Sequence, residues 1–314
     1  PGPDICGTCR SKRCRCPAGR LVPVLRHPAT SQWQPSAHLS GTVADARRLL
    51  AGVSNAVVLT GAGVSTDSGV PDYRGPNSMR ATPMMYSEFV GHELARRRYW
   101  ARNYQGWASM STVEPNTAHR AIAKWEHAGK PCPMVGLITQ NVDGLHETAG
   151  SRRLITLHGR AADVRCLGCG RVSSRAALQH RLADANPGVQ VKRFLEHAEL
   201  RPDADAEVAD WRDFRVPGCE VCGGILKPDV VFFGESVPKH RVAVANNWCA
   251  GADALLVAGS SLTVMSGLRF ARSMAKQGKP VIIINAGATR ADDLAAVRLD
   301  MAVGQALARL SAEV

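Results

Sequence analysis

The stretch AVVLTGAGVS, residues 56–65, decides the fold. Its first half is a short apolar, β-branched run, which is typical of a strand covered on both faces. Gly61, Ala62 and Gly63 then form a turn whose glycines allow close backbone approach to a pyrophosphate, and Ser65 adds a hydrogen-bond donor. Because residue 66 is Thr, the turn lacks the third glycine of G-x-G-x-x-G, so alone it indicates nucleotide binding only weakly.

Similar apolar runs recur at residues 135–139, 154–157, 254–258 and 281–285, with helical stretches such as 266–277 between them. A first helix is expected after the N-cap Thr42, ending at Gly52. Short, nearly unalternating strands separated by helices predict an α/β fold with a doubly wound, parallel, Rossmann-like sheet.

The texture of the chain changes along its length. Residues 1–40 lack periodicity and are interpreted as a disordered tail, whose four cysteines are more simply unconnected than a metal site. The Rossmann-like domain is assigned to residues 41–165 and 225–314, with a helical insert at 77–113. Turn residues, charges and paired cysteines mark residues 166–224 as a small inserted module.

Composition bounds the possible function. The 314 residues, 45% hydrophobic, supply a sizeable core, and there is neither an apolar run of membrane-spanning length nor a secretory signal. We therefore expect no membrane partner and an intracellular location: the cytoplasm, or the mitochondrial matrix in a eukaryote. The net charge is +12, of which +5 lies in the first 28 residues and +7 in the rest of the chain. It suits anionic ligands or acidic proteins, or only a solvated surface.

Two C-x-x-C pairs carry a specific signal. Cys166 and Cys169 form one pair and Cys219 and Cys222 the other, and each pair is followed by a glycine that lets it turn back. Four thiolates on two such knuckles predict one tetrahedral zinc ion. Because four sulfur ligands leave no position open for water, the metal is expected to be structural. Cys132 and Cys249 lack such partners and are interpreted as packed thiols.

Polar side chains gather where the predicted strands end. Asp72, Tyr73 and Arg74 follow the glycine turn on a stiff loop, and the segment 139–146 carries amide and carboxylate groups that suit ribose hydroxyls and a carboxamide. His158 ends the next strand, at the edge where such sheets bind ligands. Its position favours a catalytic role. His119, His146 and the tryptophans 100, 107 and 125 are interpreted as capping or packing residues.

The ordered set of motifs is similar to that of the sirtuin family, and most similar to its class II branch, over about residues 42–312. The motifs are GAGVSTDSGVPDYRG (61–75), TQNVDGLH (139–146), LHG (157–159), the paired cysteines, LKPDVVFFGE (226–235), GSSLTVMSG (259–267) and IINAG (283–287).

The resemblance implies an enzyme that consumes NAD and contains one structural zinc. It implies His158 as general base, with Asn141 beside it in the catalytic site. The cofactor-binding residues that it implies are Gly61, Ala62, Gly63, Ser65, Asp72, Tyr73, Arg74, Gln140, Asn141, Asp143, Gly259, Ser260, Ser261, Asn285, Gly287 and, by a weaker match, Val303. Those implied for the acyl-lysine substrate are Val231, Phe233, Gly234 and Glu235.

The function that the resemblance implies is protein-lysine deacylation, in which an acyl-lysine protein or peptide and NAD give free lysine, nicotinamide and O-acyl-ADP-ribose. An NAD-dependent protein ADP-ribosyltransferase using the same site is the alternative. A nucleic-acid-binding zinc ribbon is disfavoured because His158, Asn141 and Asp143 are intact, so no specific nucleic acid is expected. The fold alone would also permit a dehydrogenase, but the incomplete glycine motif argues against one.

Overall fold

The structure is a computed structural model and describes residues 41–73, 83–191 and 211–311, all within one compact unit of the chain. The predicted tail at 1–40, with its cysteines, lies outside the described residues. Two sheets organise the rest: a six-stranded parallel sheet and a three-stranded antiparallel sheet. Among the described helices, none is both long and apolar enough to cross a membrane.

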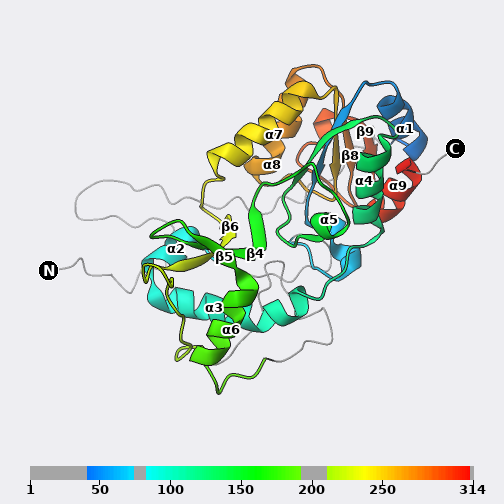
Figure 1. The fold of residues 1–314 in the computed structure, drawn as a ribbon. Helices are drawn as coiled ribbons and strands as arrows, with labels where there is room; N and C mark the ends of the chain where they lie inside the picture. The colour runs from blue at the N-terminus through cyan, green and yellow to red at the C-terminus, as the bar shows by residue number, and fades with distance from the viewer. Residues whose placement is uncertain (1–40, 74–82, 192–210, 312–314) are drawn as a thin grey trace, which may run out of the picture. The chain divides into compact units, whose positions relative to one another are not determined.

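The parallel sheet has the strand order β3-β2-β1-β7-β8-β9. Figure 1 labels β8 and β9 of this sheet. Its strands are β1 (Ala56–Thr60), β2 (Met134–Thr139), β3 (Leu154–Thr156), β7 (Ala254–Ala258), β8 (Val281–Ile284) and β9 (Ala295–Leu299). The order runs outward in both directions from the β1–β7 pair, so the carboxyl ends of these two strands form the switch point of a doubly wound sheet. The predicted fold class is confirmed.

Helices cover both faces of this sheet, and the strands between them are buried, as the unalternating sequence predicts. One face packs against α1 (Val43–Ala51), α4 (Thr117–Ala128) and α9 (Val303–Ser311). The other packs against α7 (Lys239–Gly251) and α8 (Met265–Lys276). Helix α1 starts at Thr42, whose hydroxyl accepts a hydrogen bond from the Asp45 N–H, and its C-cap is Gly52, as predicted.

The antiparallel sheet has the order β5-β4-β6 and carries the cysteine pairs. Its strands are β4 (Gly159–Cys166), β5 (Val172–Ser174) and β6 (Leu226–Val230), followed or flanked by α6 (Arg175–Ala185), α2 (Tyr86–Gly91) and α3 (Glu93–Met110). Aromatic side chains fill this second core, and the buried Trp100 donates from Nε1 to the Leu226 carbonyl at 3.1 Å. The small sheet thus begins before residue 166 and ends after residue 224.

Candidate functional site

A cavity of about 970 Å³ lies where the strands β1, β2 and β7 end, as expected for a doubly wound sheet. All but two of the cofactor residues suggested by sequence line it: Gly61, Ala62, Gly63, Ser65, Asp72, Tyr73, Gln140, Asn141, Asp143, Gly259, Ser260, Ser261, Asn285 and Gly287. His158 and the four substrate candidates Val231, Phe233, Gly234 and Glu235 line the same cavity. Residues from distant parts of the sequence therefore meet at one place.

The two exceptions differ in kind. Arg74 lies outside the described residues. Val303 begins helix α9 and is buried in the main hydrophobic core, not among the residues that line the cavity. The structure thus gives Val303 a packing role instead of a place in the cavity wall.

The glycine turns after β1 and β7 touch through their backbones. The Gly63 N–H donates to the Gly259 carbonyl at 2.9 Å, and Gly259 has a positive φ of 61°. A Cβ on Gly61 would lie 2.8 Å from the same carbonyl oxygen, so a side chain there would push the loops apart. The cavity is consequently lined here by main chain, which is the surface that a pyrophosphate needs.

Ser65 is the centre of a buried hydrogen-bond network beside this turn. Its hydroxyl donates to Asp143 Oδ2 at 2.7 Å and accepts from Asn141 Nδ2 at 3.0 Å. His119 approaches it through Nε2 at 3.4 Å. Because His119 Nδ1 accepts the Asn116 N–H at 3.3 Å, the proton of the neutral ring is on Nε2, which donates to Ser65. The side chains of Asn141 and Asp143 are thereby held in place by Ser65.

A second branch holds the backbone of Asn141. Its N–H donates to Thr139 Oγ1 at 3.1 Å, and Thr139 accepts from Thr60 Oγ1 at 2.9 Å. Thr60 in turn contacts His146 Nε2 at 2.9 Å. The predicted capping role of His119 is confirmed, but the sequence did not predict that His119 contacts Ser65 of the cavity or that His146 is connected to Asn141 through Thr60 and Thr139. Only His146 had a usable signal, because it follows the polar end of β2 in sequence.

His158 is oriented by a contact at each ring nitrogen. Nδ1 lies 3.0 Å from the Gln140 carbonyl oxygen, which can only accept, so the ring proton of neutral His158 is on Nδ1. The lone pair on Nε2 faces the Ser266 hydroxyl at 2.9 Å, and both residues line the cavity. The pKa of His158 is lowered to about 4, mainly by burial and also by the Arg241 charge, while the Gln140 contact opposes the shift. The geometry makes Nε2 a proton acceptor at neutral pH.

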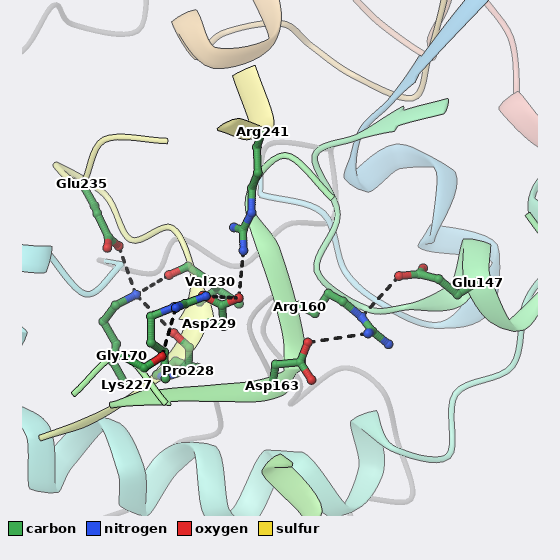
Figure 2. A network of polar contacts seen from close by, with 11 residues as sticks. Glu147, Arg160, Asp163, Gly170, Lys227, Pro228, Asp229, Val230, Glu235 and Arg241 are labelled. Carbon is green, nitrogen blue, oxygen red and sulfur yellow. Dashed lines mark hydrogen bonds and ion pairs between the residues drawn. The ribbon is translucent and has the colours of Figure 1, made fainter. Parts of the chain in front are cut away.

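Figure 2 shows the ion pairs that support this region from strand β6. Asp229 accepts from Arg165 Nε at 2.9 Å, next to the first zinc-ligand candidate, and from Arg241 Nη2 of α7 at 2.8 Å. Lys227, almost fully buried, pairs with Glu235 at 3.1 Å. Sequence reasoning did not single out Asp229 or Arg241, because their contacts span elements that no local pattern connects.

The four predicted metal ligands converge. The Sγ atoms of Cys166, Cys169, Cys219 and Cys222 all lie within 4.8 Å of one another, with 3.5 Å between Cys166 and Cys222 and 3.8 Å between Cys169 and Cys219. Zinc–sulfur bonds of about 2.3 Å in a tetrahedron place sulfurs about 3.8 Å apart. N–H groups of Cys169 and Gly168 lower the pKa of Cys166 to about 6, which favours a thiolate. The donor set fits a zinc ion.

The buried histidines predict that the free energy of unfolding falls as the pH is lowered. Burial lowers the pKa of His119 and His158 from 6.5 to about 4, and lowers that of His146 well below 6.5. Between these values the unfolded chain binds protons that the folded chain does not, so stability is lost below about pH 6.5, by about 1.4 kcal/mol per pH unit for each histidine. Urea unfolding at pH 7.5, 6.5 and 5.5, with saturating zinc in every sample, measures this. Equal free energies at all three values would contradict the burial of neutral rings.

Known proteins resemble this chain in sequence and structure. A family model described as the Sir2 family matches residues 61–266. NAD-dependent protein deacetylase 1 of Streptomyces coelicolor is 49% identical over 293 residues, covering 90% of this chain and 94% of the relative. The Mycobacterium avium protein of the same name is 52% identical over 262 residues, covering 82% of this chain and 90% of the relative.

A solved structure of Sir2 with a p53 peptide and NAD+ superposes with a TM-score of 0.67 at 29% identity, covering 86% of this chain and 97% of that one. A second, with a propionylated peptide, gives a TM-score of 0.66 at 28% identity, covering 86% and 97%. The sheet, the cavity, the cysteine cluster and these similarities agree with the family suggested by the motifs. This chain belongs to the Sir2 family, the sirtuins.

Proposed function

We propose that this chain is an NAD-dependent protein-lysine deacetylase whose active site is the cavity at the strand ends. The observation that carries the proposal is His158, a neutral imidazole whose Nε2 lone pair faces a cavity lined by the glycine turns and by Asn141 and Asp143. Relatives about half identical in sequence are named NAD-dependent protein deacetylases.

The residues of the cavity fit NAD in two halves. The main-chain surface at Gly61, Gly63 and Gly259 suits the pyrophosphate. Asn141 and Asp143, fixed through Ser65, suit the hydroxyls and the carboxamide of the nicotinamide half. When bound, NAD supplies a ribose C1′ from which nicotinamide leaves. The protein's contribution at that point is alignment, because Asn141 and Asp143 are already immobilised.

His158 would then act as general base on a ribose hydroxyl. A neutral Nε2 can take that proton, and the Gln140 carbonyl on Nδ1 stabilises the imidazolium that results. Ser266 must release Nε2 for the ribose hydroxyl to reach it, since both compete for one lone pair. Proton transfer would let that oxygen bond to the acyl carbon, and one water molecule, consumed in the reaction, would complete the release of the lysine amine.

The loop after β6 would bind the acyl-lysine. Val231 and Phe233 line the cavity, and the Val231 N–H donates to the His158 carbonyl at 2.7 Å, which places this loop directly beside the base. The carboxylate of Glu235 accepts from the Phe232 N–H at 2.8 Å and from Lys227, so it shapes the loop from inside. Because its carboxylate is already paired within the protein, Glu235 would support a bound peptide by fixing the loop conformation and not by pairing with a charge on the peptide.

The cysteine cluster would hold zinc as a structural ion. All four thiols converge on one another and no cavity residue is among them, so the metal supplies stability instead of chemistry.

A labelling experiment tests the function. With an acetyl-lysine peptide and NAD labelled in its adenosine half, the label is expected in O-acetyl-ADP-ribose, one per lysine freed, because an aligned acyl oxygen outcompetes other nucleophiles for C1′. Mass spectrometry of the small-molecule and protein fractions measures this. Label bound covalently to protein, with nicotinamide release that acetyl peptide does not accelerate, would show an ADP-ribosyltransferase instead.

A further inference from the structure

Three arginines contact residues 263 and 265, where the loop after β7 enters helix α8 at the edge of the cavity. Arg290 donates from Nη1 to the Thr263 carbonyl at 2.9 Å, and Arg269 donates from Nε to the Met265 carbonyl at 3.3 Å. Arg272 Nη1 lies 4.0 Å from Met265 Sδ. We call Arg269, Arg272 and Arg290 the arginine cluster; all three side chains are solvent-exposed.

The cluster has no acidic counterpart in the described part of the chain. Within residues 41–73, 83–191 and 211–311, none of its guanidinium groups forms an ion pair with a carboxylate. The nearest acid in sequence to Arg290, Asp292, is buried and pairs with Arg298 at 2.9 Å. Arg269 and Arg272 lie three residues apart on α8, so their charges repel each other, and an anionic partner would relieve that repulsion.

The position of the cluster indicates what that partner is. The cavity that the cluster borders is lined by Thr263, Met265 and Arg269. The same cavity is lined by Phe233 and Glu235, which lie on the loop proposed to hold the acyl-lysine. Met265 is 45% exposed, so the loop presents a surface to solvent next to the cavity. A peptide whose modified lysine enters the cavity beside Phe233 can extend its neighbouring residues over this rim, toward the long arginine side chains.

We propose that the arginine cluster selects acyl-lysines that lie in acidic sequence. Carboxylates near the modified lysine would bind the exposed guanidinium groups, which match carboxylates in geometry. The inference rests on the proposed deacetylase function and names its substrate class. Exposed ion pairs are individually weak, so the preference is expected to be moderate and sensitive to salt.

The test uses three acetyl-lysine peptides of equal length whose flanking residues are glutamate, glutamine or lysine. We expect kcat/KM for the glutamate peptide to exceed that for the glutamine peptide about tenfold at low ionic strength. The ratio should fall toward about twofold in 0.5 M salt, because screening shortens the reach of surface charges. The lysine peptide should be the poorest.

Two triple variants identify the residues responsible. R269Q/R272Q/R290Q should reduce the glutamate-to-glutamine ratio to about one, whereas R269K/R272K/R290K, which retains the charge, should keep most of it. The charge-matched control K124Q/R152Q/K276Q removes three exposed cations outside the cavity lining and should leave the ratio unchanged. A ratio near one in the wild type, or an unchanged ratio in the glutamine variant, would overturn the inference.

Binding of the same peptides, followed by fluorescence anisotropy, separates this inference from the proposed function. Absence of turnover on every peptide would refute the deacetylase, while binding would still show whether acidic peptides are preferred. A single-stranded oligonucleotide serves as a competing probe. If it binds the wild type and not the glutamine variant, and acidic peptides show no preference, the cluster is a nucleic-acid surface and the inference is wrong.

Discussion

Replacing His158 by alanine is expected to reduce deacetylation by about 10²- to 10⁴-fold, the range that a lost general base typically costs. NAD binding should change by no more than a few-fold, because the imidazole contacts Gln140 and Ser266 instead of the glycine turns. Single-turnover assays of lysine release, with NAD affinity from calorimetry, separate the two effects.

The matched control is His127→Ala, which removes an exposed histidine at the end of α4, outside the cavity lining. It should retain wild-type turnover. Turnover by His158→Ala within about threefold of wild type would refute the general-base assignment, since proton transfer by a positioned side chain contributes far more than that.

Replacing Cys166 or Cys219 by serine is expected to abolish zinc binding and the cooperative folding of the small sheet. Structural zinc sites contribute about 10–16 kcal/mol in small zinc domains, which rivals the entire stability of a typical domain, about 5–15 kcal/mol. Elemental analysis should give one zinc per wild-type chain and none per variant, and circular dichroism should show lost structure.

Cys249→Ser is the matched control, because Cys249 is buried in the core of the parallel sheet and is not one of the four clustered cysteines. It should keep one zinc per chain. A Cys166→Ser protein that retains zinc and an unchanged thermal unfolding curve would contradict the assignment of the cluster.

The large sheet was predictable because its signals are local. The runs at 56–60 and 254–258 coincide with β1 and β7, since an apolar β-branched stretch has few alternatives to a buried strand. Strand β9 was missed: its sequence AAVRL is short and contains the buried, ion-paired Arg298, which a hydropathy pattern reads as exposed. β5, with three residues, carries too little pattern to be found.

The candidate site also contains residues that the sequence predicts and residues that it does not. Glycine turns, polar strand ends and C-x-x-C pairs have sequence signatures, so nearly all of the residues predicted for the site line the cavity or form the cysteine cluster. The residues that support the site from outside these motifs were not predicted. Ser266 reaches His158 over 108 positions, and Arg241 reaches Asp229 between a helix and a strand, so only the folded chain brings these groups together. The arginine cluster likewise combines two residues of α8 with Arg290, which follows β8 in the sequence and contacts the Thr263 carbonyl.

Strand β4 begins at Gly159, directly after the imidazole, and ends at Cys166, the first zinc-ligand candidate. One strand therefore connects the base to the metal site. This strand pairs with β6, whose Asp229 also forms an ion pair with Arg165 of β4. The lifetime of the active enzyme is then set by the residence time of the metal. In a chelator, activity should decay at the rate of zinc dissociation, well ahead of the unfolding of the parallel sheet.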